Sequence, residues 1–215
     1  MKYSIKINKL SNEDWNTKAF VSLVFGDKLK VNDITIRQAQ NGALFVAMPG
    51  YKTSKTDDQG NPVYKNFCYP ISAEFRKELF DNIIQAFKDN KKEVSVHPEE
   101  DKMDIGITMQ QSSNNSFKCI GRFYIGKDFV VDGVKIIDSD KGPFVAMPTK
   151  SKTDGAGKTE YNQICYPITK EFREELYGAI LDKGNEVVQK NEKHNADMVA
   201  ELDEGYIERE GLPFR

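Results

Sequence analysis

Apolar and polar residues alternate along the first part of the chain, and this period of two predicts β-strands. Residues 4–8 alternate in this way, as a strand does when one face is buried. Residues 19–25 are rich in β-branched and aromatic side chains and end at Gly26 and Asp27. A glycine in the first position of a two-residue loop tolerates positive φ, so we expect a type II′ hairpin turn there.

Further strands are expected before a helix. Residues 34–36 alternate again, and the Phe-Val-Ala-Met run at 45–48 is typical of a buried strand that ends at a proline. A loop is expected at 57–61, followed by one more strand through Phe67.

The helix is predicted from a four-residue period. Phe75, Leu79, Ile83 and Phe87 form one apolar stripe that can pack on a sheet, and Ser72 is a suitable N-cap residue.

The whole pattern occurs twice. The repeated blocks are Phe-Val-Ala-Met-Pro (45–49 and 144–148), Cys-Tyr-Pro-Ile (68–71 and 165–168) and Glu-Phe-Arg (74–76 and 171–173). A period near 100 residues is the size of a domain rather than of a solenoid unit. We therefore predict two copies of one domain, at 1–88 and 103–183, joined by a charged linker at 89–102 and followed by an acidic tail at 184–215.

The order of the predicted elements indicates the fold class. Strands followed by a single helix, without alternation of strands and helices, predict an α+β domain. Each copy should have an antiparallel sheet and a C-terminal amphipathic helix. In the second copy Thr169 takes the N-cap position, and Phe172, Leu176 and Ile180 repeat the stripe.

Composition and charge narrow the class of protein. Of 215 residues, 39% are apolar and 30% are charged, and no apolar run approaches the ~20 residues of a membrane span. The N-terminus has no apolar core typical of a secretion signal, so we expect a cytoplasmic protein without a membrane partner. The net charge is +4 for 1–88, −2 for 89–102, zero for 103–183 and −4 for 184–215.

The cysteines, histidines and glycine-rich segment of the chain give little basis for catalysis. Three cysteines without a Cys-x-x-Cys spacing and only two histidines make a disulfide framework, a zinc site or a nucleophile–histidine pair improbable. Residues 155–159, Gly-Ala-Gly-Lys-Thr, lack the first glycine of a phosphate-binding loop because Lys152 stands there. We expect buried core cysteines, no catalytic residues, no metal and no cofactor.

Lysines and tyrosines gather in the segment after each Phe-Val-Ala-Met-Pro block, and more cations lie near each helix start. Such lysines can bind phosphates, and aromatic rings beside them can stack on unpaired bases. The competing interpretations are a solvated loop and ordinary i,i+4 ion pairs on a helix surface. The candidate nucleic-acid-binding residues are Lys52, Lys55, Lys65, Lys150, Lys152 and Lys158 in the loops, and Arg76, Lys77, Lys170 and Arg173 near the helices.

The repeated blocks resemble the SpoVG (septation protein) family. The resemblance covers the strand into Phe-Val-Ala-Met-Pro, the basic loop, the Pro-Ile pair and the helix, in both copies. It implies an α+β fold, DNA or RNA binding by a bacterial regulator, and association in pairs. For this chain the resemblance implies an intrachain pseudo-dimer or a homo-oligomer. Tyr69 and Tyr166 stand where the family usually has histidine.

Two functions remain as hypotheses at this point. The first is a regulatory protein that grips the phosphates of DNA or RNA through the basic loops of two duplicated domains. The second is a protein-interaction adaptor whose acidic tail recruits a partner or inhibits its own domains.

Overall fold

Three consecutive strands in each half of the chain pair as an antiparallel meander. The computed structural model describes residues 1–11, 16–100, 103–114, 116–153, 155 and 157–207. The meander strands are β1 (Tyr3–Lys9), β2 (Thr17–Phe25) and β3 (Leu29–Gln38) in the first half, and β9 (Ile105–Gln111), β10 (Cys119–Ile125) and β11 (Phe129–Ile137) in the second. The predicted alternation is confirmed, because β1 buries Tyr3, Ile5 and Ile7 and exposes the residues between them more.

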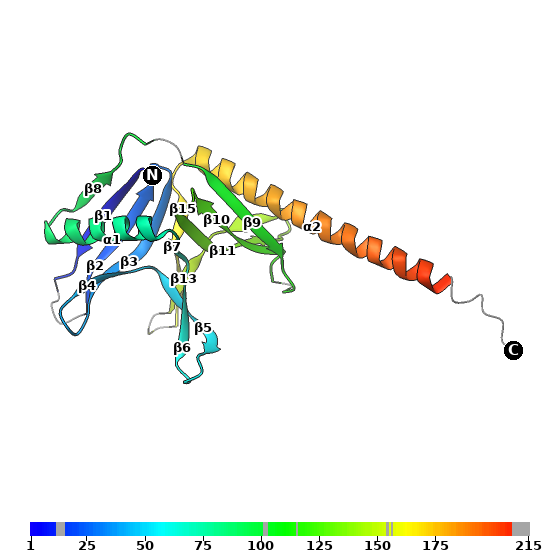
Figure 1. Ribbon diagram of the computed structural model, residues 1–215, viewed down its shortest axis with the longest axis horizontal. Helices are drawn as coiled ribbons and strands as arrows, with labels where there is room; N and C mark the ends of the chain where they lie inside the picture. Colours follow the sequence, from blue (N-terminus) through cyan, green and yellow to red (C-terminus); the bar gives the residue numbers. More distant parts are fainter. Residues whose placement is uncertain (12–15, 101–102, 115, 154, 156, 208–215) are drawn as a thin grey trace.

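A short strand and a hairpin follow each meander. The short strands are β4 (Leu44–Ala47) on β3 and β12 (Phe144–Ala146) on β11. The hairpins are β5 (Gly50–Thr56) with β6 (Pro62–Asn66), and β13 (Thr149–Thr153) with β14 (Thr159–Gln163). Each hairpin is a separate two-stranded sheet, and both project to the same side of the molecule (Figure 1). The basic segments after Pro49 and Pro148 are therefore largely strands rather than the expected loops, whereas the loop expected at 57–61 is confirmed as the tip of the first hairpin.

The two copies exchange a strand. After its hairpin, the first copy crosses to the second sheet, where β7 (Cys68–Pro70) pairs with β11. The second copy crosses in the other direction, and its β15 (Cys165–Pro167) pairs with β3. One further backbone bond prolongs each exchange, from Ile71 N–H to the Asp128 carbonyl (2.7 Å) and from Ile168 N–H to the Lys28 carbonyl (2.8 Å). The copies thus pack as an intrachain pseudo-dimer.

A helix closes each copy as predicted. In α1 (Ala73–Lys88) the Phe75 N–H donates to Ser72 Oγ at 3.2 Å, and in α2 (Lys170–Ile207) the Phe172 N–H donates to Thr169 Oγ1 at 3.3 Å. The apolar stripes are buried, except that Phe87 is only partly so. Among the described helices, none is long and apolar enough to cross a bilayer.

The second helix is much longer than its repeat partner. It continues past the sheet and through most of the segment expected to be a separate tail (Figure 1). Residues 208–215 of that tail lie outside the described part of the chain.

One hydrophobic core spans both copies. The rings of Phe25 and Phe129, one from each copy, lie 4.8 Å apart between centroids and are both fully buried. All three cysteines are buried, and burial raises the pKa of the Cys68 and Cys165 thiols. They are therefore core residues, as expected.

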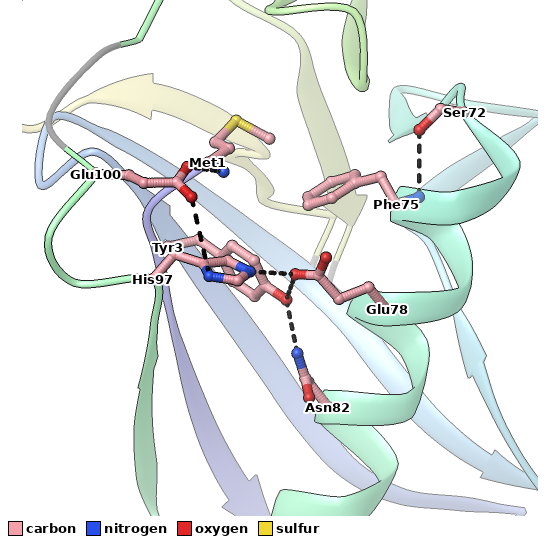
Figure 2. Close-up of polar contacts among 8 residues, drawn as sticks. All are labelled: Met1, Tyr3, Ser72, Phe75, Glu78, Asn82, His97 and Glu100. Carbon is pink, nitrogen blue, oxygen red and sulfur yellow. Dashed lines mark hydrogen bonds and ion pairs between the residues drawn. The ribbon is translucent and has the colours of Figure 1, made fainter.

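The segment between the copies is more than a solvated linker. It contains β8 (Glu93–Val96), which pairs with β1 because Val94 and Val96 alternate with polar residues and pack on the core. Beyond β8, His97 Nε2 lies 3.1 Å from Glu78 Oε1 on α1 (Figure 2). This contact holds the segment to the first copy, and the Tyr3 hydroxyl on β1 donates to the same Glu78 oxygen at 3.0 Å.

The first hairpin turn also differs from its prediction. Gly26 and Asp27 both have positive φ (53° and 55°), as a type I′ turn requires, because aspartate tolerates the left-handed region better than most residues. In the second copy, of the pair Gly126 and Lys127, only Gly126 is left-handed, as the type II′ turn requires.

We expect Phe129→Ala to destabilise both copies together, because its ring completes a core that they share. The free energy of unfolding should fall by about 3–5 kcal/mol. In hydrogen exchange, amides of β1–β3 and of β9–β11 should lose protection in parallel. Phe144→Ala, at a ring that is 46% exposed on β12, is the control and should change stability by less than about 0.5 kcal/mol. Loss of protection in β9–β11 alone would contradict a shared core.

Candidate nucleic-acid interface

A bulge in each sheet anchors the hairpin of the other copy. The bulges lie at Asp33 (φ 63°) on β3 and at Gly133 (φ 76°) on β11. Beside the first, the Asn32 N–H donates to the Ile164 carbonyl at 2.8 Å. Beside the second, the Asp132 N–H donates to the Phe67 carbonyl at 2.7 Å. Because Phe67 and Ile164 directly follow the hairpins, each hairpin stands on the sheet of the opposite copy.

The first hairpin carries a lysine and a tyrosine on each face. Tyr51 lies opposite Lys65, and Lys52 lies opposite Tyr64, and directly opposed residues of an antiparallel pair share a face. Tyr64 is 68% exposed, although Tyr51 also packs against Phe67 at 4.7 Å between ring centroids.

The second hairpin has a different pattern of side chains. Its exposed ring is Tyr161, which is 72% exposed and lies opposite Ser151, while Lys150 lies opposite Asn162.

Asp57 fixes the tip of the first hairpin. Its carboxylate accepts hydrogen bonds from the N–H groups of Gln59 (2.9 Å) and Asn61 (2.8 Å) and from the Asn61 side-chain amide (3.2 Å). These bonds favour the charged form, so the pKa of Asp57 lies below its usual value.

Three adjoining hollows surround the bases of the two hairpins. One of about 750 Å³ lies between β13–β14 and the first sheet, one of about 920 Å³ lies between the two hairpins, and one of about 410 Å³ lies between β5–β6 and the second sheet. The first two share Phe20, Asp33, Lys150 and Ser151, and the last two share Tyr51, Asn66, Phe67 and Thr149. We call this continuous depression the hairpin groove.

The structure brings the predicted hairpin lysines of both copies to one side of the molecule. Lys52 and Lys150 line the hairpin groove, while Lys55 and Lys65 are exposed on the first hairpin. Among the described residues, no carboxylate lies within ion-pair distance of Lys52, Lys55 or Lys65.

The second hairpin has its own acidic neighbours. Lys150 Nζ lies 2.7 Å from Asp33 Oδ2 of the other copy, and Lys158 Nζ lies 3.2 Å from Glu160 Oε1. The backbone of Lys152 lies opposite Glu160 in the same hairpin.

The predicted cations at the helix starts lie outside the groove and have partners on their own copy. Arg76 donates to the Pro70 carbonyl at 3.1 Å, and Arg173 to the Pro167 carbonyl at 3.4 Å, so both arginines brace the junction between exchanged strand and helix. Lys77 pairs with Asp81 and Lys170 with Glu174, both at i,i+4. Asp81 also raises the pKa of Lys77.

Sequence reasoning missed many of the residues that line the groove, including four that affect its charge and its aromatic lining. Phe20, Asp33, Arg37 and Lys135 come from the strands below the hairpins. The sequence did indicate Phe20. Residues 19, 21, 23 and 25 of β2 are buried, so Phe20 lies on the opposite face of the strand, where its ring is 42% exposed. Within the described residues, no three His, Cys, Asp or Glu side chains gather closely enough to hold a metal ion.

Comparison with known proteins identifies a family for both copies. The SpoVG family model matches residues 1–89 and 101–186. The chain is 33% identical over 95 residues to a septation protein SpoVG of Thermoanaerobacter sp. strain X514, which is 44% of this chain and 95% of that protein. It is 35% identical over 81 residues to the protein of that name from Brevibacillus brevis, 38% of this chain and 81% of the relative. Most of each relative thus corresponds to less than half of this chain.

We expect the tip of the first hairpin to loosen in acid. Because the pKa of Asp57 is lower in the folded hairpin, its stabilising effect is complete above the ordinary carboxyl pKa and is lost as pH falls through the lower, folded value. NMR titration should show the Gln59 and Asn61 amides shifting together below the ordinary aspartate range. Asp57→Ala should abolish that shift, whereas Asp58→Ala, at the next residue, should leave it in place. A shift of both amides at the ordinary aspartate pKa would contradict the bonded carboxylate.

Proposed function

This chain belongs to the SpoVG family, and from that membership we propose that it is a cytoplasmic regulator that binds DNA or RNA without catalysing a reaction. The observation that carries the proposal is the pair of lysine-bearing hairpins, one from each copy, that project side by side around one groove (Figure 1). Lysine ammonium groups on such hairpins can reach the phosphates of one nucleic acid at two places.

The first hairpin supplies most of the phosphate attraction in this proposal. Its lysines, Lys52, Lys55 and Lys65, are exposed and have no carboxylate at ion-pair distance among the described residues. The first copy also carries the positive net charge of +4. Each phosphate contact releases condensed counterions, so binding should weaken steeply with salt.

The second hairpin contributes less to phosphate binding, because one of its lysines already has an acidic partner. Asp33 holds Lys150 through an ion pair that joins the two copies, and a phosphate has to compete with that carboxylate. At the corresponding places in the other half, the first hairpin has Tyr51 and the second sheet has Gly133. An ion pair of this kind therefore limits phosphate binding by the second hairpin and not by the first.

The extension of α2 favours a second function for the same chain. The family match ends at residue 186, but α2 continues to Ile207, and residues 187–215 carry a net charge of −3. This acidic extension suits a basic protein surface, as an adaptor would need. Removing 192–215, which leaves in place the core contacts of Val187 and Val188 and the Asn191–Gln111 bond, should abolish capture of such a partner and leave nucleic-acid binding at least as strong.

We expect the triple variant Lys52→Ala, Lys55→Ala and Lys65→Ala to bind DNA and RNA roughly tenfold or more weakly. Its plot of log affinity against log salt should be shallower by about 2, because each lost phosphate contact removes ~0.7–0.9 from the slope. Fluorescence anisotropy with single-stranded and duplex DNA and RNA at two salt concentrations measures both quantities.

A matched control removes the same charge at the junction of α1 and the connecting segment. The variant with alanine at Lys88, Lys91 and Lys92, which are exposed near the end of α1, should keep more of the affinity and the slope. Equal effects of the two triple variants, or no binding of any nucleic acid by the unaltered chain at low salt, would contradict the proposal.

We expect Asp33→Asn to strengthen nucleic-acid binding two- to fivefold. Asparagine tolerates the left-handed backbone at this bulge, and the change frees Lys150 from an ion pair of the half-exposed kind that contributes up to about 1 kcal/mol. The same change in a Lys150→Ala background should gain clearly less. Weaker binding by Asp33→Asn would show that the carboxylate does not restrain Lys150.

A further inference from the structure

Exposed aromatic rings are concentrated along the hairpin groove. Tyr161 and Phe20 line its first hollow, and Phe20, Tyr64 and Tyr51 line its middle. These four rings are 41–72% exposed, and the most exposed are Tyr64 and Tyr161, one on each hairpin. Rings of this size usually bury most of their surface, so a row of them in one depression indicates a ligand with flat apolar faces.

Side-chain amides accompany these rings. Asn32, Asn162 and Gln163 line the first hollow, and Asn66 lines the other two. An amide offers a donor and an acceptor without net charge, which suits the edge of a nucleobase better than a phosphate.

The hairpins contribute lysines to the lining of the groove, and the strands beneath them contribute carboxylates as well as cations. Lys52 and Lys150 come from the hairpins, whereas Asp33 and Asp132 come from the bulges beneath them. Arg122 and Lys150 each pair with one of these carboxylates. The floor also holds the cations Arg37 and Lys135, but the carboxylates that line the groove lie on the floor as well. The phosphates of a polyanion therefore lie near the rim, at Lys52 and Lys150.

We propose that the nucleic acid in this groove is single-stranded, with its phosphates toward the hairpin lysines and its bases stacked on Tyr161, Phe20, Tyr64 and Tyr51. This inference rests on the nucleic-acid binding proposed above and adds the substrate class. A duplex keeps the faces of its bases inside the stack, so it offers nothing to these rings, whereas an unpaired strand offers every base.

The groove also favours one orientation of the bound polynucleotide. The two halves are related by a pseudo-twofold, but a polynucleotide has distinct 5′ and 3′ ends. The two copies present different side chains to the bound polynucleotide. Phe20 of the first copy corresponds to Ile120 of the second, and Lys150 of the second corresponds to Tyr51 of the first. The two orientations of a strand therefore meet different side chains, and one is preferred.

The test compares a single-stranded DNA 20-mer with a duplex of the same sequence, using the full chain and fluorescence anisotropy. The unaltered protein should prefer the single strand at least tenfold. Tyr64→Leu with Tyr161→Leu should weaken single-strand binding roughly thirtyfold or more, while the salt slope and duplex affinity stay unchanged. Tyr64→Phe with Tyr161→Phe should retain binding, because the rings remain.

Phe144→Leu removes a ring outside the groove that is 46% exposed, and this change should have no effect on binding. As a second readout, a single strand containing 5-iodouracil should photocrosslink to Tyr64 or Tyr161, as located by mass spectrometry. Crosslinks confined to residues outside the groove would overturn the inference.

The outcomes separate this inference from the proposed function. Equal or tighter duplex binding that is weakened by the lysine variants but not by the tyrosine variants would overturn the single-stranded ligand and leave phosphate binding intact. Failure of every nucleic acid to bind would overturn both.

Discussion

Reciprocal pairing of two three-residue strands is the interaction on which the rest of this molecule depends. By placing β7 on β11 and β15 on β3, the exchange merges two small hydrophobic cores into one and covers part of a strand edge in each sheet. A domain of fewer than 90 residues has a limited core of its own. Because each hairpin directly precedes the exchanged strand, the same pairing carries the hairpins across and brings both around one groove.

Local sequence patterns predicted most elements because the forces behind them are local. Alternation predicted β1, and a run of β-branched and aromatic residues predicted β2. The four-residue stripe behind Ser72 predicted the start and the buried face of α1. The exchange could not be predicted in the same way, since Cys-Tyr-Pro pairs equally well with either sheet in principle. Val94 and Val96 alternate with polar residues, as in a strand, but the many charged residues around them favoured the interpretation as a linker.

The candidate site was predicted in part for similar reasons. Residue type and position identified the hairpin lysines, but their neighbours follow from tertiary structure. Asp33 lies 117 residues before Lys150, and only the crossing of the chain brings the two together. Arg76 and Arg173 repeat faithfully because both brace a strand–helix junction, and a repeated cation can thus have a structural role.

The covalent joining of the two copies changes how the assembly responds to dilution. A pair formed from separate chains dissociates at low abundance, and any surface shared by the partners is lost with it. Here both copies belong to one chain, so the second copy is always present in a one-to-one ratio with the first. The segment that connects them is also held to the first copy by β8 and His97. Each half can also accumulate its own substitutions, a freedom denied to identical subunits, in which every change appears twice.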